Sequence, residues 1–157
     1  MVFLLSIPGQ AKLQINTVLF DLNGTLACDG LIAASTRQLL TELGTQLTLV
    51  VMTADTHGTL DEVIAELPIA AHRTPQGAGA PAKRALLETL GTAHTIAVGN
   101  GRNDVEMLRT AALGIAVLGP EGTATPALLA ADIIFRTIDD ALESLLHPQR
   151  LVATLRP

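Results

Sequence analysis

The fold of this chain is decided by the stretch Val18-Leu19-Phe20-Asp21-Leu22-Asn23-Gly24-Thr25. Three apolar residues predict a short strand, and the carboxylate that follows would project into the crevice beyond the strand end. A nucleophilic aspartate belongs in such a place. Gly24 permits a sharp turn that Thr25 can hydrogen-bond. The alternative is an ordinary turn in which Asp21 only caps the chain.

Strands and helices are predicted to alternate along the rest of the chain. Continuous apolar runs at Leu47 to Met52, Ile96 to Val98 and Ile115 to Leu118 are typical of strands covered on both faces. Apolar residues spaced by three and four predict helices around 39–43, 86–90 and 141–146. The alternation predicts an α/β fold, with a doubly wound, mostly parallel, Rossmann-like sheet and helices on both faces.

Helix boundaries and an N-terminal hairpin follow from local signals. Helix starts are expected at Asp61, at Pro81 and at Asn103 or Asp104, and stops at Gly44 and Gly91. Val2 to Ile7 and Leu13 to Asn16 flank the turn signal Pro8-Gly9-Gln10, which predicts a β-hairpin at the edge of a sheet.

Length and composition limit the classes of function. A chain of 157 residues predicts a single domain, 1–157, since domains run to roughly 150 residues. Aromatic residues make up 2% and the formal charge is -5, which argues against partners such as nucleic acid or anionic lipid. One cysteine and no apolar run near the ~20 residues of a membrane span predict a cytoplasmic protein.

Two further polar segments lie near predicted strand ends or helix starts. In Met52-Thr53-Ala54-Asp55 a hydroxyl and backbone N–H groups can hold phosphate oxygens, or Thr53 is an ordinary helix cap. Lys83, one of two lysines, follows the glycine-rich run Gly77 to Ala80. It is either a functional cation or a solvated surface charge.

The segment Gly99-Asn100-Gly101-Arg102-Asn103-Asp104 follows another predicted strand. Its two amides and its carboxylate suit a hard cation such as Mg2+. A glycine turn with an Asn or Asp cap is the alternative, and it leaves part of the run unexplained.

In order and in spelling, these segments resemble the haloacid dehalogenase-like (HAD) phosphotransferase superfamily, and more closely its capless, soluble P-type-ATPase-like branch. Asp21 to Thr25 is similar to D-K-T-G-T, Met52 to Asp55 to M-T-G-D, and Gly99 to Asp104 to G-D-G-x-N-D. The resemblance runs from about Val18 to Leu118. The remaining C-terminal strand and helix are consistent with the same fold.

The resemblance implies a role for each segment. Asp21 would attack a phosphoryl group and form an aspartyl-phosphate, while Thr53 and the Ala54 N–H hold its oxygens. Lys83 would neutralise the developing charge. The required Mg2+ would be surrounded, directly or through water, by the Asn23 carbonyl and the side chains of Asp21, Asn100 and Asp104.

Two departures from the family pattern predict low activity. Asn23 stands where family phosphatases carry the aspartate that transfers protons, and an amide cannot do so at neutral pH. Asn100 stands where a metal-binding aspartate is expected, which predicts weaker Mg2+ binding. The alternative function is therefore a catalytically weakened regulatory domain that binds phosphate or a metabolite.

The resemblance also predicts how substrate is held. About one helix fills each of the intervals Asp21 to Thr53 and Thr53 to Lys83, so no cap domain fits. Leu26 to Leu31 is a candidate flap over an open site. We expect a phosphorylated small molecule or a larger phosphorylated substrate, and water exclusion aided by homo-oligomerisation.

Two other features have weaker functional interpretations. Gly77 to Ala82 spells the dinucleotide fingerprint G-x-G-x-x-A, but it lacks a suitable preceding strand and the acidic residue expected some 20 positions later. His57 follows Asp55 closely enough to border the site.

Overall fold

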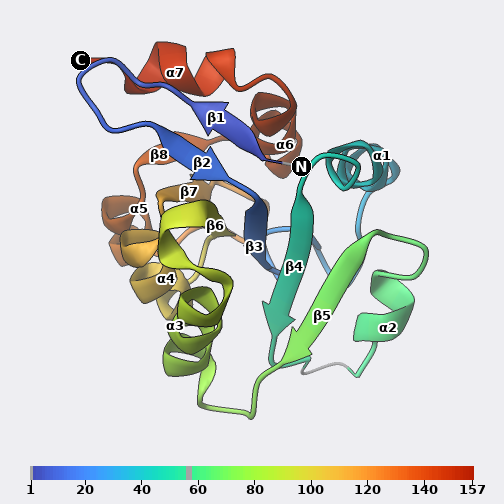
Figure 1. Ribbon diagram of the computed structural model, residues 1–157. Coiled ribbons are helices and arrows are strands. Elements are labelled where there is room, and N and C mark those ends of the chain that lie inside the picture. Colours follow the sequence, from blue (N-terminus) through green and yellow to red (C-terminus); the bar gives the residue numbers. More distant parts are fainter. Residues whose placement is uncertain (1, 56–57) are drawn as a thin grey trace.

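A six-stranded parallel sheet forms the centre of the computed structural model, which describes residues 2–55 and 58–157 (Figure 1). The strands of this sheet lie in the spatial order β5-β4-β3-β6-β7-β8. They are β3 Thr17–Asp21, β4 Thr48–Thr53, β5 Ile69–Arg73, β6 Thr95–Gly99, β7 Leu113–Val117 and β8 Ile133–Phe135. Every residue of β3, β6 and β7 is buried, as predicted for strands covered on both faces.

Helices cover both faces of this sheet. They are α1 Ala34–Leu43, α2 Leu60–Val63, α3 Gly79–Leu90, α4 Val105–Thr110, α5 Thr125–Ala130, α6 Ile138–Leu146 and α7 Gln149–Leu155, with 3-10 turns at Thr92–His94 and Arg102–Asp104. Alternate residues of β3 point to opposite faces. Phe20 packs in the core with α1, α6 and α7, whereas Leu19 packs with α3, α4 and α5.

The strand order reverses at β3. Strands β4 and β5 extend the sheet on one side of β3, and β6, β7 and β8 extend it on the other. In open parallel sheets, ligands bind in the crevice beyond the carboxyl ends of the strands at such a reversal. Asp21 is the last residue of β3 and Asn100 follows β6, its neighbour across the reversal.

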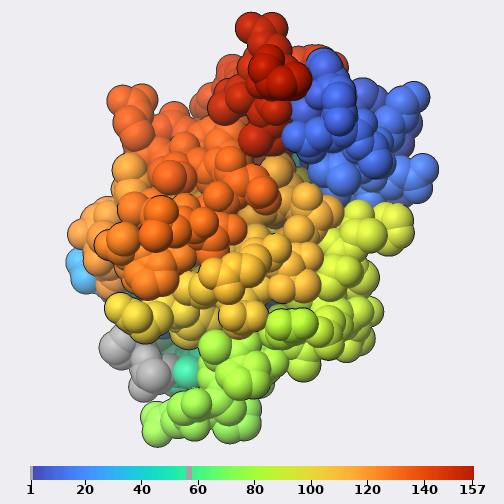
Figure 2. Space-filling view, turned by 90° about the vertical axis from the view of Figure 1, so that its left-hand side faces the viewer, coloured from blue at the N-terminus to red at the C-terminus, as the bar shows by residue number. Residues whose placement is uncertain are grey.

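The N-terminal hairpin is confirmed, but it forms a sheet of its own. Strands β1 (Phe3–Leu5) and β2 (Leu13–Ile15) pair antiparallel in a separate two-stranded sheet. The N–H of Gln10 donates to the carbonyl of Ile7 at 3.1 Å, and Gly9 has φ +80°. This is the turn that Pro8-Gly9 favours. Figure 2 shows the N-terminal segment beside the C-terminal end of the chain.

The predicted fold class is confirmed, and the differences concern short elements. Gly44 and Gly91 end α1 and α3 as expected. Helix α3 begins at Gly79, two residues before the predicted start at Pro81. Strand β5 was not predicted, because it ends in the polar residues His72 and Arg73 and three of its five residues are exposed at the edge of the sheet. Over the described ranges, no helix is long and apolar enough to cross a membrane.

Replacing Leu142 by alanine is expected to lower the free energy of unfolding by about 2–5 kcal/mol, because the side chain is fully buried between α6 and the sheet. The matched control is Leu129→Ala on α5, where the leucine is 82% exposed and the expected change is within about 0.5 kcal/mol. Urea denaturation measures both. Equal losses would contradict the assignment of the core.

Candidate active site

Residues from four strand ends and from α3 meet around one cavity of about 300 Å³ beyond the reversal of strand order. Asp21 ends β3, Thr53 ends β4, and Lys83 lies in the second turn of α3. The cavity is lined by Asp21, Asn23, Thr53, Ala54, Thr74, Gly79, Lys83, Asn100, Gly101 and Asn103. Six of the seven predicted site residues therefore line one cavity, and the seventh, Asp104, contacts it through Lys83.

Lys83 joins the two carboxylates of the site. Its Nζ donates to Asp21 Oδ1 at 2.6 Å and to Asp104 Oδ1 at 2.7 Å. The side chain is only 2% exposed. The alternative of a solvated surface lysine is therefore wrong.

Asp104 is fully buried and holds the loop after β6 in place. Its Oδ2 accepts hydrogen bonds from the backbone N–H of Asn100 at 3.0 Å and of Gly101 at 2.9 Å. Only glycine fits at position 99, since a Cβ there would lie 2.6 Å from the Asp104 carboxyl carbon. Both Asp104 oxygens are engaged, so this carboxylate positions the loop and Lys83.

Burial and charge shift the protonation equilibria of the pair. Burial, reinforced by the Asp104 carboxylate, raises the pKa of Asp21 from 3.8 to about 6, although Lys83 and Thr25 oppose the rise. Burial disfavours the charged form of Lys83, but the carboxylates of Asp21 and Asp104 outweigh it and raise the pKa of the lysine above 10.5. The lysine therefore remains a cation at neutral pH.

Two oxygens of the site lie close enough to Thr25 to compete for its proton. Thr25 Oγ1 is 3.2 Å from both Asp21 Oδ2 and Asn100 Oδ1. A hydroxyl carries one proton, so one of these oxygens always keeps a free acceptor position. A carboxylate oxygen and an amide oxygen are both suitable ligands for Mg2+, and water and substrate phosphate would complete its coordination shell.

These oxygen ligands fit Mg2+. Among residues 2–55 and 58–157, no group of three or more His, Cys, Asp or Glu side chains is placed to hold a metal ion. Mg2+ commonly uses only one or two carboxylates. Asp21 and Asn100 are the side chains suited to direct contact, and Asp104 is engaged elsewhere.

Gly24 allows the chain to pass close to the loop after β6. Its φ is +78°, and a Cβ there would lie 2.8 Å from Glu121 Oε2 and would also overlap the Asn100 amide. The sharp turn predicted at Gly24 is confirmed, and it brings Thr25 to Asp21 and Asn100.

The end of β4 presents the Thr53 hydroxyl to the cavity. The backbone N–H of Asp55 donates to Thr53 Oγ1 at 3.2 Å, so the hydroxyl proton is available to an acceptor in the cavity. Asp55 itself has φ +48° and is held by Arg73, whose Nε donates to Asp55 Oδ2 at 3.1 Å. His57 lies outside the described residues.

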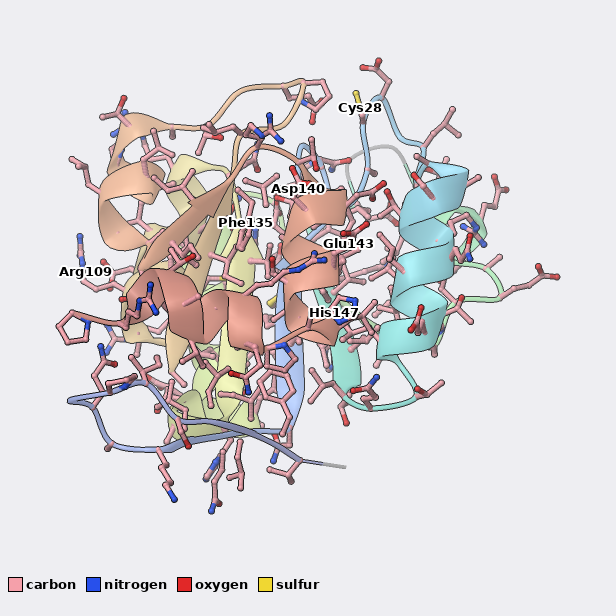
Figure 3. The ribbon with its side chains drawn as sticks, turned by 90° about the horizontal axis from the view of Figure 1, so that it is seen from above. Cys28, Arg109, Phe135, Asp140, Glu143 and His147 are labelled. Carbon is pink, nitrogen blue, oxygen red and sulfur yellow. The ribbon has the colours of Figure 1, made fainter. Side chains whose placement is uncertain are left out.

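Asn23 lines both the cavity around Asp21, called the catalytic cavity below after the role that the sequence predicts for it, and a larger one. Asn23 is half-buried, and this wider neighbouring cavity has a volume of about 620 Å³. The turn of the candidate flap, where Cys28 and Leu31 exchange backbone hydrogen bonds, borders that neighbouring cavity with Asp29 and Leu31. Figure 3 shows Cys28 near α1, away from the C-terminal end of α6 marked by His147. Glu62 and Glu121 also line the wider cavity.

Thr74 and Asn103 line the cavity without having been predicted as site residues. Thr74 follows β5, and its backbone N–H donates to the Thr53 carbonyl at 2.9 Å. Its buried Oγ1 has no hydrogen-bond partner among the described residues. Its position directly after a strand could have indicated a site residue, but strand β5 itself was not predicted from the sequence.

Replacing Lys83 by methionine is expected to lower the free energy of unfolding by about 3–5 kcal/mol, because two buried carboxylates lose their shared cation. Urea denaturation in a metal chelator measures the change. Adding Asp21→Asn to Lys83→Met should regain part of the loss, since one unpaired charge is removed.

The exposed Lys12 offers the control, with a change of at most about 0.5 kcal/mol expected for Lys12→Met. Equal effects at the two lysines would contradict the role of Lys83 as the shared cation.

Comparisons with known proteins concern part of the sequence and the fold of most of the chain. A family model for haloacid dehalogenase-like hydrolases matches residues 80–141. An uncharacterised protein of Methanocaldococcus jannaschii is 49% identical over 61 residues, which are 39% of this chain and 66% of that relative. The matched segment thus spans slightly less than two thirds of the relative.

Solved structures with the same fold cover nearly the whole chain. A 3-deoxy-D-manno-octulosonate 8-phosphate phosphatase from Moraxella catarrhalis, in complex with magnesium, phosphate and the sugar acid, has a TM-score of 0.71 at 20% identity, covering 90% of this chain and 94% of its own. The cobalt-bound form of a deoxy-D-mannose-octulosonate 8-phosphate phosphatase from Haemophilus influenzae has a TM-score of 0.69 at 14% identity, covering 91% of this chain and 94% of its own.

A haloacid dehalogenase-like hydrolase from Bacteroides thetaiotaomicron has a TM-score of 0.61 at 16% identity, covering 85% of this chain and 99% of its own. These likenesses show the fold, and the P-type-ATPase-like branch stays a prediction. Residues 80–141 thus match a family model for haloacid dehalogenase-like hydrolases, and nearly the whole chain shares the fold of the solved structures.

Proposed function

We propose that the protein is a Mg2+-dependent phosphoric-monoester hydrolase or phosphotransferase that works through an aspartyl-phosphate on Asp21. The observation that carries the proposal is the position of Asp21. It ends the central strand at the reversal of strand order, in one cavity with Thr53, Ala54 and Lys83. Similar structures from Moraxella catarrhalis and Haemophilus influenzae are named as phosphatases, one with magnesium and phosphate and the other with cobalt.

Each residue around the cavity supplies one part of this chemistry. Asp21 attacks phosphorus through a carboxylate oxygen, and Lys83, already at hydrogen-bond distance from that carboxylate, offsets the charge that develops. The Thr53 hydroxyl and the Ala54 N–H hold phosphoryl oxygens. When bound, Mg2+ would offset the repulsion between carboxylate and phosphate, held by Asp21, Asn100 and the Asn23 carbonyl, with Asp104 acting indirectly.

The two asparagines limit the rate of this reaction. Asn23 cannot exchange a proton with the leaving group or with water, and general acid–base catalysis contributes roughly 10²- to 10⁴-fold. Asn100 brings no charge to the proposed metal site. The Mg2+ concentration for half-maximal activity is therefore expected to be higher than it would be with a carboxylate at this position. Slow turnover is therefore expected.

Asp21→Asn is expected to lower Mg2+-dependent release of phosphate from 4-nitrophenyl phosphate or acetyl phosphate by at least about 10³-fold, because the nucleophile is lost. The matched control is Asp140→Asn on α6, a partly exposed carboxylate that does not line the cavity, for which activity should be unchanged. Phosphate release that is the same in Asp21→Asn and the wild type would overturn the proposal.

The regulatory alternative has its own signature in the same experiment. Binding of beryllofluoride or phosphate by the wild type, with no turnover and no gain from Asn23→Asp, would favour a domain that senses phosphate or a metabolite. The absence of charge at Asn23 and Asn100 is the observation behind this second candidate.

A further inference from the structure

The cavity around Asp21 offers few groups that can exchange a proton with a substrate. Among the described residues that line it, Asp21 and Lys83 are the ionisable ones. Asp21 is the nucleophile of the proposed function. Lys83 is almost fully buried, and its ammonium group is held by Asp21 and Asp104 at 2.6 and 2.7 Å.

Asn23 cannot replace the missing acid. Asn23 lines both the catalytic cavity and the wider neighbouring cavity, so it stands at the junction of the two. An amide N–H can donate a hydrogen bond to a departing oxygen, but it does not transfer its proton at neutral pH.

The nearby carboxylates do not line the catalytic cavity. Asp29 and Glu121 line only the wider neighbouring cavity and are exposed. Both therefore lie outside the cavity that holds Asp21 and are not placed to donate a proton to a leaving group there.

We propose that this site selects phosphoryl donors whose leaving group departs as a weakly basic anion, acyl phosphates above all, and discriminates against alkyl phosphates. This inference rests on the proposed function of Asp21. Its physical basis is that a leaving oxygen which is stable as an anion needs no proton in the transition state, whereas an alkoxide does.

The step balances without a proton donor. One Asp21 carboxylate oxygen forms a bond to phosphorus, and the bond between phosphorus and the leaving oxygen breaks. The leaving group takes that electron pair and departs as a carboxylate. Water then attacks phosphorus, Asp21 departs as a carboxylate, and the proton of the water goes to the released phosphate or to solvent.

The second step also lacks a general base in Asn23, so kcat depends on the rates of both steps. The ratio kcat/KM reports the reaction up to the first irreversible step, which is transfer of the phosphoryl group to Asp21. Leaving-group selection is therefore measured in kcat/KM.

The experiment compares acetyl phosphate, 4-nitrophenyl phosphate, phenyl phosphate and glycerol 3-phosphate at saturating Mg2+. Their leaving groups rise in basicity from acetate to an alkoxide. Asn23→Asp should raise kcat/KM for glycerol 3-phosphate by roughly 10²- to 10⁴-fold, and for acetyl phosphate by less than about threefold, because only the alkoxide needs the restored acid.

Asn100→Asp is the matched control, since it makes the same change of an amide to a carboxylate in the same cavity. It should alter kcat/KM for all four substrates by a similar factor and lower the Mg2+ concentration for half-maximal activity. The comparison separates proton transfer from added negative charge.

The outcomes distinguish this inference from the proposed function. The inference is supported if wild-type kcat/KM falls steeply as the leaving group becomes more basic, and if Asn23→Asp makes kcat/KM depend less on that basicity. If wild-type kcat/KM changes little with the basicity of the leaving group while turnover still requires Asp21, the inference is overturned and the proposed function stands. This holds whichever residue supplies the proton, His57 included. Turnover of none of the four substrates, or turnover that does not require Asp21, overturns the proposed function.

Discussion

The ammonium group of Lys83 is the interaction on which the arrangement of this site depends. It brings together a carboxylate at the end of β3 and a carboxylate of the loop after β6, two neighbouring strands on opposite sides of the reversal in strand order. Two carboxylates buried this close repel each other, and each would lose the hydration that stabilises its charge. A shared cation from α3 stabilises the pair, and it also holds a positive charge beside Asp21, the nucleophile of the proposed function.

The backbone has to make room for this arrangement. Gly99 leaves space for the Asp104 carboxyl group, and Gly24 lets the chain turn with φ +78° against the Asn100 amide. The carboxylate of Asp104 in turn holds the N–H groups of Asn100 and Gly101. The charged groups and the tight turns are therefore parts of one structure, because neither fits without the other.

The two asparagines change the chemistry of this arrangement while leaving its geometry in place. Asn100 still offers an oxygen beside Asp21 and Thr25, and its amide nitrogen donates to the Gly122 carbonyl at 3.0 Å, a bond that a carboxylate could not make. Asn23 keeps its place at the junction of two cavities. In the proposed function, the cavity therefore keeps the groups that would hold a phosphoryl group, whereas proton transfer and negative charge near the proposed metal are reduced.

The sequence by itself determined the parallel α/β sheet, the hairpin at Pro8-Gly9 and the segments that form the site. These features depend on local patterns: continuous apolar runs, helical spacing and turn residues that act over a few positions. Strand β5 was not predicted, because an edge strand with polar, exposed residues lacks that pattern. Thr74, which follows this strand, was therefore not predicted as a site residue. Only the tertiary structure decided that Lys83 is buried between Asp21 and Asp104. It also decided that both oxygens of Asp104 accept hydrogen bonds that position the loop and Lys83. The contact of Thr25 with both Asp21 and Asn100 likewise appears only in the folded chain. Such contacts join residues 62 or 75 positions apart, and their energies depend on burial and distance, which no local pattern of the sequence encodes.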